Sequence, residues 1–226
     1  MMDYILKKSL GDKVAQRLHK SIFPNKCLFC QKALVDKADF ACGECMEAYQ
    51  VKELWITYIE GISQVFVPFS YVGDVRHSVF RFKYGMERSL ATKMSAAAFK
   101  SFGDVVAGDC IIPVPLHHKR LKERGYNQST LLAMELSALF GVPAVDGLER
   151  VKETEKLFGL SRDKRLETLA GAMAVRDGWD VCGKHIVLVD DILTTGSTAQ
   201  QCAKVLLEAG AKQVDLLAFA GVIRQG

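Results

Sequence analysis

The sequence predicts an α/β fold, a mainly parallel sheet flanked by helices, with a small four-cysteine module before it. Two observations lead to this prediction. From about residue 50 onward, short apolar runs alternate with segments of helical periodicity, the pattern of parallel strands joined by crossover helices. Before that point the periodicity is lost and four cysteines gather in a short stretch. The expected organisation is an N-terminal amphipathic helix at 1–23, a cysteine module at 24–48 and the main domain at 50–226.

The composition is that of a globular chain. Its 226 residues are 49% hydrophobic and 25% charged, values that exclude a disordered, collagen-like or coiled-coil protein. The net charge of +4 permits contact with nucleic acid or anionic lipid but requires neither. No apolar run approaches the roughly 18 residues of a membrane-spanning helix, and no export signal precedes the seven cysteines. We therefore expect a cytoplasmic protein without a transmembrane segment, whose thiols stay reduced.

The N-terminal stretch carries an apolar side chain at every fourth position from residue 6 to residue 22, which predicts a helix with one apolar face. Its remaining surface is largely basic. The helix is expected to pack on its own domain; the alternative is that it lies on a membrane or in the groove of a partner.

The main domain is expected to alternate strands with helices. Strands are predicted at 54–59, 65–71, 110–115, 142–145, 172–175, 185–190 and 213–220. Helices are predicted at 74–84, 88–102, 128–140 and 198–209. The stretch 116–127 is predicted to be a polar loop, and 150–168 either a lid or a disordered connection. Phe80, Phe82 and Tyr84 are assigned to the core, with stacking on bases as the alternative.

Four of the cysteines form two pairs at the spacing of metal ligands: Cys27, Cys30, Cys42 and Cys45. Each thiolate pair can occupy one edge of a tetrahedron around a borderline-soft cation, so the sequence predicts a zinc site. Protein ligands fill all four positions, and the zinc is therefore expected to be structural. The alternatives are four reduced surface thiols and, for the whole module, a nucleic-acid-binding zinc knot. The remaining cysteines, Cys110, Cys182 and Cys202, are expected to be buried.

Two acids stand at the end of the strand predicted at 185–190, where open parallel sheets bind ligands. Small and hydroxylated residues then lead into a helix, and the backbone N–H groups at such a helix start suit a phosphate. The acids repel phosphate, but they can accept hydrogen bonds from the 2′ and 3′ hydroxyls of a ribose. The sequence therefore predicts a site for a ribose 5′-phosphate, which a hard cation can join, with an ordinary turn as the alternative. The residues concerned are Asp190, Asp191, Thr194, Thr195, Gly196, Ser197 and Thr198.

A second candidate segment follows the strand predicted at 110–115. Residues 117–124 contain two histidines and four Lys or Arg residues against one Glu, which suits a polyanion of charge near −3. A solvated charged loop is the alternative interpretation. The peptide bonds before Pro113 and Pro115 are candidates for the cis form, which would turn backbone amides toward the anion.

Residues 187–198, Val-Leu-Val-Asp-Asp-Ile-Leu-Thr-Thr-Gly-Ser-Thr, resemble the 5-phosphoribosyl-1-diphosphate (PRPP) binding loop of type I phosphoribosyltransferases. A second stretch, Ile112-Pro113-Val114-Pro115-Leu116, is followed by Arg120 and by Arg124-Gly125-Tyr126-Asn127-Gln128. Together with the four-cysteine module, these motifs resemble the ComF (ComFC) competence proteins over nearly the whole chain.

This resemblance implies a type I phosphoribosyltransferase-like domain that binds PRPP with Mg²⁺ through the loop just described. It also implies that the diphosphate, or a lid over it, lies across the pocket from the two acids. The residues implied on that side are Pro115, Leu116, Lys119, Arg120, Arg124 and Arg165. No residue is assigned a catalytic role.

The family resemblance further implies a role in DNA uptake during natural transformation. The protein is expected to assist single-stranded DNA import at the inner face of the cytoplasmic membrane, with a ComFA-like helicase as partner. The alternative is an active phosphoribosyltransferase, a glycosyltransferase that moves phosphoribose from PRPP to an unidentified amine or base.

Three positions depart from related patterns. Family members generally carry Gln and Asn where this chain has Leu157 and Thr168, and Thr194 stands where relatives that use 6-oxopurines carry an acid. A threonine is not a general base, so purine salvage is disfavoured and catalytic turnover is left open.

Overall fold

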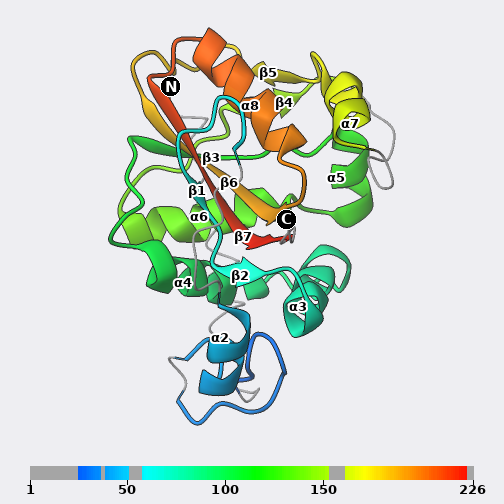
Figure 1. Ribbon diagram of the computed structural model, residues 1–226, viewed down its shortest axis with the longest axis vertical. Helices are drawn as coiled ribbons and strands as arrows, with labels where there is room; N and C mark the ends of the chain where they lie inside the picture. The colour runs from blue at the N-terminus through cyan, green and yellow to red at the C-terminus, as the bar shows by residue number, and fades with distance from the viewer. Residues whose placement is uncertain (1–24, 37–38, 51–57, 153–160, 223–226) are drawn as a thin grey trace.

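The computed structural model of the chain describes residues 25–36, 39–50, 58–152 and 161–222 (Figure 1). The N-terminal helix predicted at 1–23 lies outside the described residues, as does most of the strand predicted at 54–59. The rest of the chain allows the predicted alternation of strands and helices to be compared with the structure.

The main sheet is parallel throughout, as predicted. Its strands run in the order β1-β7-β6-β3. The short β2 also pairs with β7, closer to the C-terminal end of β7 than β1 does. The strands are β1 (Val65–Phe66), β2 (Phe69–Ser70), β3 (Cys110–Pro113), β6 (His185–Leu193) and β7 (Gln213–Gly221). The two long strands, β6 and β7, lie side by side in the middle, and β3 lies on the other side of β6.

Helices cover both faces of this sheet. The long ones are α3 (Gly73–Tyr84), α4 (Leu90–Phe102), α6 (Gln128–Phe140) and α8 (Ser197–Glu208). In Figure 1, α4 and α6 lie below the sheet, and α8 lies above it beside two short strands, β4 (Leu148–Arg150) and β5 (Met173–Val175). None of the helices among the described residues has the length and apolar character needed to cross a membrane.

The apolar run of β6 explains the two-sided packing, because successive residues of a strand face opposite sides of the sheet. Val187 and Val189 belong to the hydrophobic cluster formed with α3, α4 and α6. Ile186 and Leu188 belong to the cluster formed with α8 and the β4–β5 pair. A strand covered on both faces needs apolar residues at every position, which is why this run was recognisable in the sequence.

The structure differs from the sequence prediction between β3 and β5. The predicted loop at 116–127 contains a short helix, α5 (His118–Arg124), in which no residue is buried. The predicted strand at 142–145 is a single bridge from Ala144 to Ile111. The β4 strand was not predicted and pairs antiparallel with β5. Another helix, α7 (Arg162–Leu169), lies in the segment predicted to be a lid or disordered.

Expectations about burial were partly wrong. Cys110 and Cys202 are buried, but Cys182 is exposed in the turn that leads to β6. Phe82 is fully buried, as predicted, whereas Phe80 and Tyr84 are exposed on the outer side of α3. The helical period places Phe82 on the opposite side of the helix from its two aromatic neighbours.

Gly196, which ends the loop between β6 and α8, has a steric requirement that can be tested. Its φ is +77°, and an added Cβ would lie 2.7 Å from Cδ1 and 2.9 Å from Cγ1 of the buried Ile59. Gly141 has a similar φ of +71°, with nothing within 4 Å of an added Cβ. We expect Gly141→Ala to cost about 1 kcal/mol of backbone strain, and Gly196→Ala to cost about 1 to 3 kcal/mol more. Urea denaturation of both variants measures this difference, and equal losses would contradict the predicted clash.

Candidate functional site

The site predicted from the sequence lies where β3 and β6 end. Pro113 pairs with Val189, and the Val114 N–H donates to the Val189 carbonyl at 2.9 Å. Because both strands are parallel, the segments that leave them start at the same edge of the sheet. The structure therefore brings the start of the Pro115 loop next to the segment of β6 that carries Asp190.

The two acids lie within β6 rather than at its end. The strand continues to Leu193 because β7 is equally long and pairs with it up to Gly221. Asp190 and Asp191 lie next to each other on β6, and each has a different partner. We call these two residues the acid pair.

Asp190 is held by hydrogen bonds to one of its oxygens. Its Oδ1 accepts from the Ser129 hydroxyl at 3.0 Å and from the Asp191 N–H at 2.8 Å. Burial, together with the neighbouring Asp191 charge, raises the pKa of Asp190 to about 7, although Lys83 and these hydrogen bonds oppose the shift. The protonated and the ionised forms of Asp190 are therefore both populated near neutral pH.

Asp191 is paired with a lysine that the sequence analysis missed. Lys83, from the last turn of α3, places its Nζ 3.0 Å from Oδ2 of Asp191, which is only 5% exposed. Burial lowers the pKa of Lys83, but the charges of Asp191 and Asp190 outweigh burial and raise it overall. In the sequence Lys83 stands among aromatic residues of an ordinary amphipathic helix, and Ser129 is one of several serines at helix starts. Neither carries a signal for a site, because their roles arise from tertiary packing alone.

The loop that follows the acids has the features predicted for a phosphate site. Gly196 takes the left-handed conformation at the N-cap of α8, and as a glycine it has no side chain to cap the N–H groups of the first turn. The hydroxyls of Thr195 and buried Ser197 lie 2.9 Å apart, and the Ser197 N–H points to the Thr195 hydroxyl at 3.4 Å. Thr194 is exposed and Thr198 is half-buried in the first turn. The uncapped N–H groups and the helix dipole suit an anion at this position.

The basic residues of α5 follow β3. Pro115 is buried, Leu116 and Arg120 are half-buried, and Lys119 is exposed. The pKa of Arg150 on β4 is lowered first by burial and then by the nearby charge of Arg120, so two arginines approach each other there. No cis peptide bond occurs among the described residues, and the bonds before both prolines are therefore trans.

Arg124 links α5 to α3. Its guanidinium donates to Gln128 Oε1 at 3.0 Å and to the Tyr84 hydroxyl at 3.2 Å, and it lies 5.0 Å from the centre of the Tyr84 ring. Its charge also acts on Lys83, the partner of Asp191. Arg165 lies in α7, and its side chain is outside what the structure describes.

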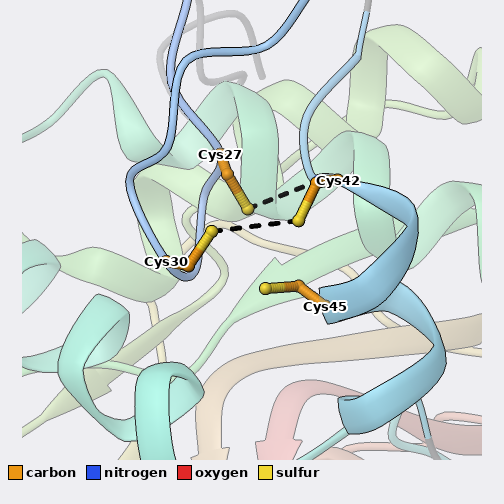
Figure 2. Close-up of side chains that lie close together, drawn as sticks. All are labelled: Cys27, Cys30, Cys42 and Cys45. Carbon is orange, nitrogen blue, oxygen red and sulfur yellow. Dashed lines mark hydrogen bonds between the residues drawn. The ribbon is translucent and has the colours of Figure 1, made fainter.

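The four predicted metal ligands converge in the N-terminal module (Figure 2). The Sγ atoms of Cys27, Cys30, Cys42 and Cys45 all lie within 4.8 Å of one another. The first pair comes from a tight turn, while Cys42 precedes α2 (Gly43–Tyr49) and Cys45 lies in its first turn. Four convergent thiols are a donor set that fits a tetrahedral metal ion such as zinc. This cluster is confirmed by the structure as one that can hold a metal.

The thiols differ in their environments. Burial raises the pKa of Cys27, but backbone N–H groups, first that of Cys42, outweigh burial and lower it to about 7. Burial and the neighbouring cysteines raise the pKa of Cys45. Four such groups cannot all ionise at this separation without a cation to compensate them, which supports metal binding.

The cysteine module is attached to α3. The Leu28 carbonyl, between the first two cysteines, accepts from the Ser78 hydroxyl and from an Arg81 N–H, each at 2.7 Å. Phe29 is buried against Phe69, with ring centres 5.1 Å apart, and belongs to the cluster that includes α4 and α6. The module thus shares the core of the main sheet, and the helix that it braces is the one that carries Lys83.

Comparison with known proteins agrees with this geometry. Residues 127–225 match the family model for a phosphoribosyl transferase domain, so the sheet and its edge belong to a phosphoribosyltransferase-like protein. Competence protein F of Haemophilus influenzae is 30% identical over 186 residues, which cover 79% of this chain and 77% of that protein. The chain therefore belongs to the ComF family of competence proteins.

Two further similarities are more limited. DNA utilization protein YhgH of Escherichia coli O157:H7 is 38% identical over 109 residues, 48% of this chain and 47% of that protein. The match thus spans about half the length of that relative. Among solved structures, the glutamine PRPP amidotransferase from Bacillus subtilis aligns with a TM-score of 0.39 and 21% identity, covering 59% of this chain and 26% of that one.

Metal binding by the cysteine cluster can be tested by single substitutions. We expect the wild type to bind roughly one zinc ion per chain, and Cys30→Ser to lose most of it and to lower the free energy of unfolding by about 3 kcal/mol. Cys182→Ser, which changes an exposed cysteine outside the cluster, is expected to keep the metal. Elemental analysis of the purified variants gives the metal content. The same zinc content in both variants would exclude the cluster as its site.

The acid pair predicts a pH-dependent stability. An unfolded Asp has a pKa of about 3.9, whereas Asp190 in the folded chain has a pKa of about 7. Between these values the folded state binds more protons, so the contribution of Asp190 to stability falls as the pH rises. Relative to the wild type, Asp190→Asn should therefore gain about 2 kcal/mol of stability between pH 5 and pH 8.

Urea denaturation across this pH range measures that gain. Asp104→Asn, which removes an exposed carboxylate at the opposite end of β3, provides the reference change. If both substitutions gave the same change with pH, the raised pKa of Asp190 would be contradicted.

Proposed function

We propose that this protein acts in DNA uptake during natural transformation and binds PRPP with Mg²⁺ at the carboxyl edge of its sheet. Its membership in the ComF family and its phosphoribosyl transferase domain support the role and the class of ligand. The names of its relatives, a competence protein and a DNA utilization protein, point to DNA as the object of the process. Import of single-stranded DNA at the membrane, with a ComFA-like helicase as partner, belongs to the same proposal.

The observation that carries the proposal is the position of the acid pair beside the uncapped start of α8. Carboxylates can accept hydrogen bonds from the two ribose hydroxyls, and the N–H groups of α8 can receive the 5′-phosphate. Thr194, Thr195 and Gly196 form the loop between them, and Ser197 and Thr198 begin α8. The backbone sets the distance between the acid pair and the start of α8, because the acids lie in β6 and the loop is the turn that follows this strand.

The diphosphate is assigned to the side of β3. Lys119, Arg120 and Arg124 are placed there by α5, which begins five residues after β3 ends. Arg165, from α7, and the backbone at Pro115 and Leu116 complete the proposed set. Several guanidinium groups suit a ligand that carries two linked phosphates, because each can donate to two oxygens.

Mg²⁺ fits the donor set on the same edge. Carboxylate and phosphate oxygens are the ligands that this ion prefers, and Asp190 and Asp191 supply the former. The ion would neutralise charge on the diphosphate when bound. Lys83 supplies the balancing charge of the acid pair within the chain itself, at 3.0 Å from Asp191.

An active phosphoribosyltransferase is the second candidate, favoured by the match of residues 127–225 to a transferase domain. Transfer would break the bond between the anomeric carbon and the diphosphate oxygen and form one to an amine or a base. Release of diphosphate from PRPP across a panel of amines and bases distinguishes this reading from binding alone. Turnover with any acceptor would establish the enzyme.

Titration calorimetry with PRPP and Mg²⁺ tests the binding proposal. We expect the wild type to bind and the double variant Asp190→Asn, Asp191→Asn to bind about 100-fold more weakly, because two charge-assisted hydrogen bonds become neutral ones. Asp104→Asn, remote from the edge, is the matched control and should bind like the wild type.

The outcomes separate the claims. If the wild type fails to bind, PRPP is not the ligand of this edge. If the double variant binds as tightly as the wild type, the assignment of the ribose to these two acids is wrong.

A further inference from the structure

The outer side of α3 exposes two aromatic rings to solvent. Phe80 is 57% exposed and Tyr84 59% exposed, and their ring centres lie 5.0 Å apart with an interplanar angle of 46°. They stand one helical turn apart, while Phe82 between them is buried. Exposed aromatic rings that lie together on a surface indicate an interaction site, because their exposure to water is unfavourable and a partner would bury them.

Basic side chains of α5 lie beside these rings. This helix contains four Lys or Arg against one Glu, and none of its residues is buried. The Arg124 guanidinium lies 5.0 Å from the centre of the Tyr84 ring, and the Arg88 guanidinium lies 4.8 Å from that of Tyr126. Arg88 also donates to the Gly125 carbonyl at 3.0 Å. The end of α3 and the end of α5 therefore form one continuous surface, which we call the α3–α5 face.

The chemistry of the α3–α5 face identifies its partner. Exposed aromatic rings bind flat π systems, and neighbouring cations bind a chain of anions; single-stranded nucleic acid presents both. In a duplex the π faces of the bases are hidden, so an exposed ring on a helix has nothing to stack on.

We propose that single-stranded DNA binds across the α3–α5 face, with bases stacked on Phe80 and Tyr84 and phosphates at the end of α5 that carries Lys122. The choice of DNA as the nucleic acid rests on the proposed function; the stacking surface rests on the rings and charges alone. Arg124 borders both this face and the acid pair, through its contact with Tyr84 and its charge on Lys83. The strand would thus run along the rim of the edge site.

Fluorescence anisotropy of a labelled (dT)20 oligonucleotide with the full chain tests the proposal. Phe80→Leu keeps a large apolar side chain but removes the ring, and we expect it to weaken binding about 5- to 100-fold. Phe80→Trp restores an aromatic surface and should bind like the wild type. Leu139→Ala, at an exposed position on α6, is the matched control and should have no effect.

Salt dependence tests the cationic part of the face. Lys122→Gln on α5 should reduce the slope of log affinity against log salt by about 1, because one phosphate contact is lost. Lys204→Gln, which changes an exposed lysine of α8, should leave the slope unchanged. A duplex of the same length should bind more weakly than (dT)20 and should not depend on the ring of residue 80.

Several outcomes would overturn the proposal. Unchanged (dT)20 binding by Phe80→Leu would show that the rings do not stack on bases, even if Lys122→Gln weakened it. If the wild type bound anionic phospholipid vesicles more tightly than (dT)20, and Phe80→Leu weakened the vesicle binding, the face would be assigned to a membrane.

PRPP titration of the same Phe80→Leu protein separates this proposal from the proposed function. An unchanged PRPP affinity with weakened (dT)20 binding supports both. Ring-dependent DNA binding in a wild type that does not bind PRPP would leave the α3–α5 face standing and remove the PRPP proposal. If the wild type binds PRPP but its DNA binding does not depend on the ring of residue 80, the PRPP proposal stands and the α3–α5 face is removed as the DNA site.

Discussion

Two adjacent carboxylates in a strand that is hydrogen-bonded on both sides impose the main constraint on this structure. Burial, followed by the charge of Asp191, raises the pKa of Asp190 to about 7, and groups from other elements offset part of this shift. Lys83 comes from α3 and Ser129 from α6, each at 3.0 Å from its acid. The acids thereby determine where the ends of two helices must lie.

The α3 helix connects three features that are far apart in the sequence. Ser78 and Arg81 hold the Leu28 carbonyl of the cysteine module, Lys83 holds Asp191, and Tyr84 contacts Arg124 of α5. A module of about 25 residues cannot bury enough apolar surface to order itself, so the core that it shares with the main sheet stabilises it, and a metal held by the four cysteines would add to this. The module, in turn, holds the middle and the second half of the helix whose last turn reaches the acid pair.

The sequence predicted the parts of this architecture that have a local signature. The buried run of β6, the long helices α4, α6 and α8 and the two cysteine pairs each follow from periodicity or spacing. It did not predict α5, because an exposed helix with no buried residue lacks an apolar period. It also missed Lys83 and Ser129, whose positions depend on how α3 and α6 pack, and it placed Phe80 and Tyr84 in the core because an aromatic residue in a helix is usually buried there.

The distribution of charge along the carboxyl edge supports a ligand that is anionic at both ends and rich in hydroxyls between them. The loop into α8 offers N–H groups, the acid pair offers acceptors, and the segment after β3 offers Lys119, Arg120 and Arg124. An anion alone would be repelled by the acids, and a neutral sugar would make no use of the cations. The proposed phosphorylated sugar diphosphate would complement all three groups, with its ribose at the acid pair between the other two.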